Sequence, residues 1–201
     1  MRTPLRIARY VATFAVAIAL AGCGEPDGHA AKVSSADSGA AATSATTADS
    51  TGVLRPINGR GVLALVSDGR ARVTVVNLWA TWCLPCRQEF PELLAATNAH
   101  RADGVRLLLV STDFEEQAAD VRSFLAKNAV RDTAYLKHEG DQAFIDTINP
   151  EWTGTIPATL VYDASGRRVA FWEGRADRAR FESAIQQALG ATTTTNKEKH
   201  S

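Results

Sequence analysis

The residues with the clearest chemical potential are two cysteines, Cys83 and Cys86, in the stretch VVNLWATWCLPCRQEF. The residues before them are apolar and β-branched, as in a strand, and those after them are typical of a helix. Two cysteines with this spacing can form a structural disulfide, half of a metal site or a dithiol that exchanges electrons. The rest of the chain helps to separate these alternatives.

A metal site and a structural disulfide are both disfavoured. A structural zinc site needs four ligands, commonly a second C-x-x-C pair or two histidines. The third cysteine is Cys23, and the histidines form no ligand pair: His29, His100, His138 and His200. Covalent haem attachment needs a histidine directly after the second cysteine, where this chain has Arg87. A disulfide that closes so short a loop adds little stability. We therefore predict neither a metal nor a cofactor.

Redox chemistry at this pair has a physical mechanism. Cys83 is expected at the start of a helix, where unpaired backbone N–H groups carry a charge of roughly +0.5. That field favours the thiolate, and cysteines in such positions have pKa values of about 3.5–7.5. Pro85 suits the first helical turn because it lacks an N–H group. We predict that Cys83 is the nucleophile and that the more sheltered Cys86 resolves the mixed disulfide.

The N-terminus reads as a targeting segment. Residues 10–21 are almost entirely apolar, and the residues before them include three basic side chains: Arg2, Arg6 and Arg9. This run is shorter than the roughly 20 residues of a membrane-spanning helix and matches the core of a secretory signal, about 7–15 residues. Residues 19–21, Ala-Leu-Ala, offer a cleavage site that would release a soluble protein.

A second cleavage site competes with the first. Residues 20–23, Leu-Ala-Gly-Cys, resemble a bacterial lipobox, in which the cysteine is lipidated and becomes the new N-terminus. We favour this site because three cysteines would otherwise leave one thiol unpaired in an oxidising compartment. The prediction is a signal peptide at 1–22 and a lipid anchor at Cys23, on the periplasmic side of a bacterial membrane. The choice between inner and outer membrane stays open.

Composition divides the remaining chain. Residues 24–51 are mostly small and polar, with Val33 as the only large aliphatic residue, and cannot bury enough apolar surface to offset the entropy of ordering. We predict a flexible tether at 23–52, a folded domain at 53–190 and a disordered polar tail at 191–201. Loss of the three N-terminal arginines from 22 basic residues would leave 19, against 22 acidic ones. This balance gives no reason to expect nucleic acid as a partner.

Strand and helix patterns alternate in the folded region. Apolar, β-branched runs predict strands at 72–80 and 105–112, and a two-stranded hairpin at 158–174 with its turn at 163–166. Helical periodicity predicts helices at 61–69, 86–100, 115–130, 141–149 and 177–190, the last ending at Gly190. This order predicts an α/β fold with a central mixed sheet and helices on both faces.

The cysteine motif also carries a resemblance. W-C-x-P-C after V-x-N-L-W-A and before R-Q-E-F-P resembles the TlpA/ResA branch of the thioredoxin superfamily, and T-I-P-A-T at 155–159 resembles its cis-proline loop. The resemblance covers residues 53–190 and implies a thioredoxin-like fold. It further implies that Pro157 is cis beside the disulfide and that the backbone of Ile156 pairs with an incoming polypeptide. Trp82 and Pro85 would complete this substrate groove.

Four further residues near these motifs have an expected role or position. Asn77 stands where thioredoxins carry a buried aspartate, and an amide cannot titrate. Glu89 matches the family's acidic residue near the dithiol, so it could tune the thiol pKa values or relay a proton, or simply be a solvated carboxylate. Trp79 is expected in the core, whereas Trp152 could line the groove or pack within its loop.

The direction of electron flow follows from the residues between the cysteines. Leu84 and Pro85 include no histidine to stabilise the nucleophilic thiolate, and a less stabilised thiolate makes the reduced form a better electron donor. We predict a monomeric protein-disulfide reductase. The resemblance implies a membrane electron donor of the thiol-transporter type, and clients such as apocytochrome c or a copper-site protein of an oxidase.

Two other functions stay open. A thiol peroxidase would carry its cysteine in a P-x-x-x-T-x-x-C context, and Cys83 has neither that proline nor a distant resolving cysteine within the predicted domain. A non-catalytic lipoprotein could instead hold copper through the dithiol. Copper carriers of the resembled fold usually space their cysteines differently and add a histidine.

Overall fold

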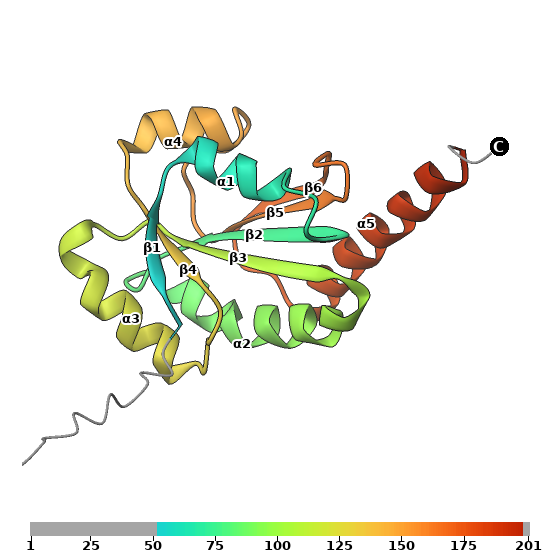
Figure 1. The fold of residues 1–201 in the computed structure, drawn as a ribbon. Coiled ribbons are helices and arrows are strands. Elements are labelled where there is room, and N and C mark those ends of the chain that lie inside the picture. The colour runs from blue at the N-terminus through green and yellow to red at the C-terminus, as the bar shows by residue number, and fades with distance from the viewer. Residues whose placement is uncertain (1–51, 199–201) are drawn as a thin grey trace, which may run out of the picture. The chain divides into compact units, whose positions relative to one another are not determined.

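The centre of the protein is a six-stranded mixed sheet. It is seen in a computed structural model that describes residues 52–198, so the predicted signal peptide, Cys23 and most of the predicted tether lie outside the described residues (Figure 1). The strand order is β1 (Leu54–Ile57), β4 (Ala134–Lys137), β3 (Val105–Ser111), β2 (Val73–Trp79), β5 (Ala158–Asp163) and β6 (Arg168–Glu173). Strands β1, β4, β3 and β2 are parallel to their neighbours in this order. Strand β5 runs antiparallel to both of its neighbours, β2 and β6.

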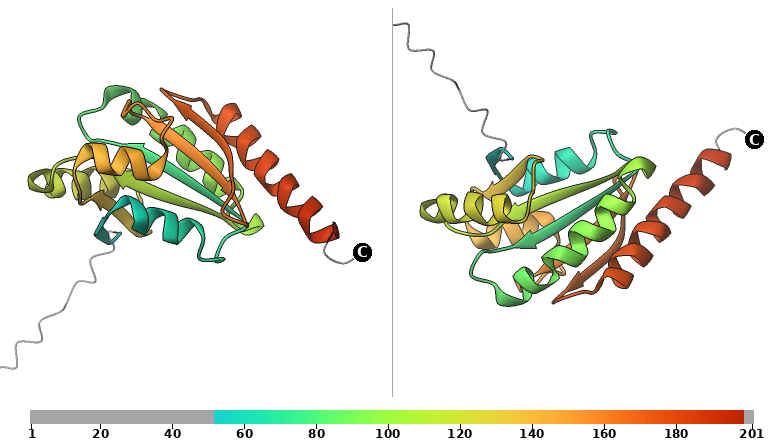
Figure 2. Two further views of the ribbon diagram at one scale, coloured as in Figure 1. Left: turned by 90° about the horizontal axis from the view of Figure 1, so that it is seen from above. Right: turned by 90° about the horizontal axis from the view of Figure 1, so that it is seen from below.

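Helices cover both faces of the sheet, as Figures 1 and 2 show. One face packs against α1 (Gly59–Val66) and α4 (Asp141–Ile148). The other packs against α2 (Leu84–Ala99), α3 (Ala118–Lys127) and α5 (Arg178–Glu198). Two short 3₁₀ helices are η1 (Arg101–Asp103) and η2 (Glu115–Gln117). This arrangement confirms the predicted fold class. Within residues 52–198, no helix combines the length and apolarity needed to cross a membrane.

Strand β2 positions the cysteine motif because it lies at the centre of the sheet. All seven of its residues are buried, which explains its continuous apolar sequence. Trp79, at its end, is fully buried and packs against Phe90 and Phe124, with ring centroids 5.2 Å and 4.9 Å away. The prediction that Trp79 belongs to the core is confirmed, and the loop leading to Cys83 therefore starts from a rigid point.

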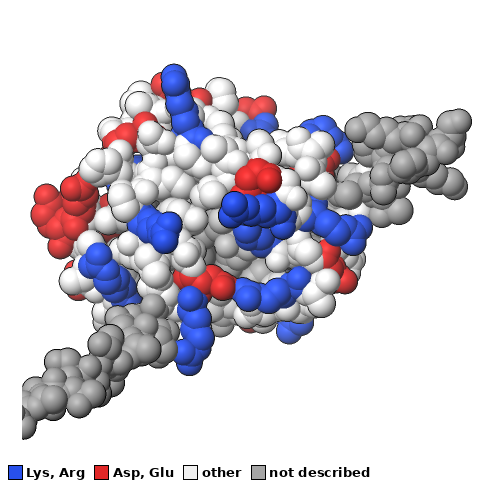
Figure 3. Space-filling model, viewed as in Figure 1, with Lys and Arg blue, Asp and Glu red and all other residues white. Residues whose placement is uncertain are grey.

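Charge is mixed on the face seen in Figure 3, where basic and acidic side chains are interspersed. This face therefore presents no large area of a single sign. Ion pairs also join different elements of the fold. Arg106 of β3 binds Asp68 of the α1–β2 turn, with Nη1 2.9 Å from Oδ2, and Arg101 pairs with Asp132.

The sequence patterns missed two strands and the end of one helix. Strands β1 and β4 have four residues each, too few to show a period, and Pro56 in β1 suits only an edge strand. The prediction that the last helix ends at Gly190 is wrong, because α5 continues to Glu198. Gly190 is not among the residues with positive φ, so it does not form the left-handed cap that would end a helix.

Two glycines in open surroundings, Gly190 and Gly69, test whether a helix runs through Gly190. A Cβ built at Gly190 or at Gly69 meets no atom within 4 Å, but Gly69 has a φ of +71°. We expect Gly190→Ala to stabilise the protein by about 0.5–1 kcal/mol, because alanine loses less backbone entropy in a helix. Gly69→Ala should destabilise it by about 1 kcal/mol, since a Cβ strains the left-handed conformation. Urea unfolding measures both, and equal shifts would contradict the helix through Gly190.

Candidate active site

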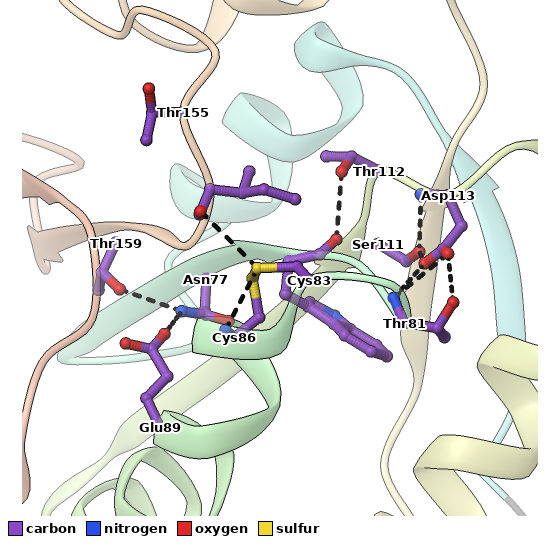
Figure 4. Close-up of a disulfide and its surroundings, with 12 residues drawn as sticks. Asn77, Thr81, Cys83, Cys86, Glu89, Ser111, Thr112, Asp113, Thr155 and Thr159 are labelled. Carbon is purple, nitrogen blue, oxygen red and sulfur yellow. Dashed lines mark hydrogen bonds between the residues drawn. A yellow bond between two sulfur atoms is a disulfide. The ribbon is translucent and has the colours of Figure 1, made fainter.

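The two cysteines lie at the N-terminus of α2 and form a disulfide (Figure 4). Cys83 is the N-cap residue, and its Sγ accepts a hydrogen bond from the backbone N–H of Cys86 at 3.2 Å. Pro85 occupies the first turn, where a missing N–H leaves no helical hydrogen bond unmade. Cys83 is 5% exposed and Cys86 only 1%. The cysteine whose sulfur accepts a helix N–H group is thus also the more exposed residue of the two.

A proline loop faces the disulfide from the other side. The Ile156–Pro157 peptide bond is cis, and the carbonyl oxygen of Ile156 lies 3.7 Å from Cys83 Sγ (Figure 4). Trp152 supports this loop, since its Nε1–H donates to the carbonyl of Thr155 at 2.8 Å and its ring packs edge-on against Phe144. Trp152 is buried, so the structure places it as a packed loop residue that also lines a pocket beside Ile156.

Glu89 is not a solvated carboxylate. It lies three residues after Cys86 on α2, is 1% exposed, and accepts hydrogen bonds at both oxygens. Asn77 Nδ2 donates to Oε1 at 3.0 Å, and the backbone N–H of Ala176 donates to Oε2 at 2.9 Å. Burial raises the pKa of the Glu89 carboxyl above its ordinary value, and these two hydrogen bonds together with the charge of Arg175 lessen the shift.

Asn77 connects Glu89 to β5, the strand that follows the proline loop. Its Nδ2 also donates to Thr159 Oγ1 of β5 at 3.1 Å, so one amide joins β2, α2 and β5 (Figure 4). Its Oδ1 is buried and accepts no hydrogen bond from any described residue. A buried acceptor without a donor costs free energy, which the two hydrogen bonds donated by Nδ2 offset in part.

A second polar network was missed by the sequence patterns. Asp113 is buried two residues after the end of β3, and its carboxylate accepts hydrogen bonds from Thr81 N–H at 3.0 Å, Thr81 Oγ1 at 2.5 Å and Ser111 Oγ at 2.5 Å (Figure 4). Thr81 lies two residues before Cys83, so this carboxylate fixes the loop that carries the cysteine. The only signal in the sequence is that Asp113 follows a buried strand, at the sheet edge where parallel strands end.

The remaining predicted site residues are placed as follows. Pro85 and Ile156 flank the disulfide from the helix and from the proline loop, respectively. Trp82, adjacent to Cys83, is 61% exposed and shares a pocket with Ile156. Within residues 52–198, no group of three or more His, Cys, Asp or Glu side chains is arranged to hold a metal ion.

Together the geometry defines a class of protein. A disulfide that caps a helix, placed after the central strand of a mixed sheet and beside a cis-proline, defines a thiol-disulfide oxidoreductase with a thioredoxin-like fold. The chain belongs to the AhpC/TSA family, whose model matches residues 56–169.

Individual relatives agree with this class. The chain is 27% identical to the thiol-disulfide oxidoreductase ResA of Bacillus subtilis over 128 residues, which cover 55% of this chain and 68% of ResA. It is 32% identical to the thiol:disulfide interchange protein HelX of Rhodobacter capsulatus over 102 residues, half of each chain. The crystal structure of a thiol:disulfide interchange protein from Chlorobium tepidum TLS matches with a TM-score of 0.51 and 26% identity, covering 61% of this chain and 83% of that one. The chain thus spans about two thirds of ResA and half of HelX, and less than half of some other curated relatives that it matches.

Proposed function

We propose that this protein is a monomeric, membrane-anchored extracytoplasmic enzyme that reduces disulfides in client proteins through Cys83 and Cys86. The observation that carries the proposal is Cys83 at the N-cap of α2, with its sulfur hydrogen-bonded to a helix N–H and facing the carbonyl of Ile156. Partial positive charge at a helix N-terminus stabilises a thiolate, which is the form that attacks disulfides.

The reaction consists of two exchanges. The Cys83 thiolate attacks one sulfur of the client disulfide, forming a mixed disulfide and releasing the other client sulfur as a thiolate. Cys86 then loses its proton and attacks Cys83 Sγ, which closes the Cys83–Cys86 disulfide and releases the second client thiolate. Two electrons pass from the enzyme to the client, and the client thiolates take up two protons. The structure corresponds to the enzyme at the end of this cycle.

Glu89 is proposed as the group that handles the Cys86 proton. It lies one helical turn after Cys86, on the same side of α2, in a site closed to solvent. Because burial raises the pKa of Glu89, its carboxylate is a stronger base than an exposed one. Asn77 holds that carboxylate in place and cannot itself take the proton. The burial and the two hydrogen bonds support this role.

Reduction is the proposed direction. The exposed residue after Cys83 is Leu84, and Pro85 follows it, so neither residue between the cysteines adds charge to stabilise the thiolate. An extracytoplasmic reductant has to be re-reduced, and a membrane protein of the thiol-transporter type would supply the electrons. Apocytochrome c and oxidase copper-site proteins are the proposed clients, on the resemblance given by the cysteine and proline motifs.

The anchor is proposed to be a lipid on Cys23. A flexible tether of about 28 residues has a root-mean-square span of roughly 30 Å, enough to hold the active site clear of a membrane. The basic, apolar N-terminus and the residues Leu-Ala-Gly-Cys at 20–23 support this part of the proposal.

The cysteines provide the central test. We expect the wild type to reduce insulin with negligible peroxide turnover and with less copper binding than one ion per chain. Cys83→Ser should lower the rate to the uncatalysed one, and Cys86→Ala should trap clients as mixed disulfides on non-reducing gels. Cys23→Ser, the matched control, should keep the rate. A reduction potential more oxidising than about −150 mV would overturn the direction.

Glu89→Gln tests the proton-handling role. The carboxylate takes a proton only when ionised, so release of a client from its mixed disulfide should slow in the wild type as pH falls through the raised Glu89 pKa. The glutamine variant should lack this dependence, and its thiols should titrate at lower pH because a negative charge near them is gone. Thiolate ultraviolet absorbance and stopped-flow kinetics measure both effects. Glu92→Gln, on the exposed face of the same helix, is the control. Overlapping curves for wild type and Glu89→Gln would remove Glu89 from the mechanism.

Metabolic labelling with a fatty acid tests the anchor. The wild-type protein expressed in a bacterium should incorporate labelled palmitate, and Cys23→Ala should incorporate none, because the thiol is the group to which the lipid is attached. Ser34→Ala, in the same predicted tether, should be labelled like the wild type. A wild type without label, recovered from the periplasm in soluble form, would instead favour cleavage after Ala21.

A further inference from the structure

Large apolar side chains are exposed mainly around the disulfide. Within residues 52–198, the exposed large hydrophobic residues are Val53, Trp82, Leu84 and Phe114. Trp82 and Leu84 flank Cys83 in the sequence, and Phe114, 65% exposed, lies in the loop between β3 and η2. Single exposed apolar side chains are common, but several around one reactive atom mark an interaction surface.

The topology explains why Phe114 lies near Cys83. Strands β2, β3 and β4 are parallel neighbours, so their carboxyl ends meet at one edge of the sheet. Cys83 follows β2, Phe114 follows β3, and Lys137 ends β4. Ligands of open α/β sheets bind at this edge.

Trp82 and Phe114 line one pocket at this edge, with a volume of about 170 Å³. Its other walls come from α4 and the proline loop: Phe144, Ile145, Trp152, Gly154 and Ile156. Pockets for whole small molecules usually measure about 300–1,000 Å³, so this pocket suits a single side chain.

The charges in the pocket cancel. Lys137 and Asp141 are its two charged lining residues, and Lys137 Nζ donates to Asp141 Oδ1 at 2.5 Å and to the carbonyl of Glu139 at 3.0 Å. The Lys137 side chain is largely buried in this pair. A charged guest would therefore lose hydration beside an ion pair that is already formed, whereas an apolar guest has no charge to desolvate.

Phe114 is held in place by its backbone. Its N–H donates to Gln117 Oε1 at 3.2 Å, its carbonyl accepts from Gln117 N–H at 2.9 Å, and the preceding Asp113 is fixed by Thr81 and Ser111. The exposed ring is thus presented by a rigid loop, which lowers the entropy lost on binding.

We propose that Trp82 and Phe114 form a docking pocket for a large apolar side chain of the client polypeptide, within two residues of the cysteine that Cys83 attacks. The inference rests on the proposed function. Ile156 links the two sites, because the residue lines the pocket and its carbonyl faces Cys83 Sγ. An extended client advances about 3.3 Å per residue, so a neighbour of its cysteine reaches the adjacent pocket.

The test compares two disulfide-bonded peptide substrates that differ at one position beside the cysteine, leucine in one and serine in the other. With the full-length reduced protein, we expect wild-type kcat/KM to favour the leucine peptide about tenfold, the loss typical of truncating a buried apolar anchor. Phe114→Ala should abolish most of that preference. Val53→Ala, at another exposed apolar residue that lies before β1 at the opposite end of the parallel strands, should keep it.

Each outcome decides a different point. An unchanged leucine-to-serine ratio in Phe114→Ala overturns the docking role, including the case in which both rates fall together. A wild type that reduces both peptides equally well overturns the inference alone, and the proposed function stands. A wild type that reduces neither peptide overturns the proposed function and this inference with it.

Discussion

The site depends on one hydrogen bond, in which the Cys86 N–H donates to the sulfur of Cys83 at the first turn of α2. It makes a sulfur atom the cap of a helix, where oxygen of serine, threonine or aspartate is the usual acceptor. The residues before Cys83 fix the position of this helix terminus. β2 ends in the buried Trp79, and Asp113 holds Thr81, so the loop between strand and helix has little freedom.

Two buried carboxylates, Asp113 and Glu89, lie near this helix terminus and differ in their surroundings. Asp113 is satisfied by hydroxyl and backbone donors from β3 and the cysteine loop, so it fixes geometry. Glu89 is held by an amide and one backbone N–H, and burial raises its pKa. Three donors on Thr81 and Ser111 hold the Asp113 carboxylate, whereas the two hydrogen bonds at Glu89 offset only part of the effect of burial on its pKa. A carboxylate in the second situation is suited to exchanging a proton.

The sequence predicted those parts of the fold and site that are local. β2 and β3 are long apolar runs, and the position of Cys83 before a helical pattern was enough to place it at a helix terminus. β1 and β4 are too short to show a period, and Gly190 looked like a helix end only because its φ is invisible in the sequence. The role of Asp113 depends on Thr81, 32 residues earlier, and that contact exists only once β2 and β3 pair. The sequence left Glu89 open between two interpretations because its burial depends on Ala176, 87 residues later.

The contact between Ile156 and Cys83 is made by a carbonyl of the main chain. Every amino acid carries that oxygen, so replacement of the residue at position 156 cannot delete the neighbour of the reactive sulfur. The same residue also lines the neighbouring pocket and packs against both hydrophobic clusters. In the proposed docking role, a substitution at position 156 would therefore change which client side chain fits, while a backbone carbonyl would still face Cys83.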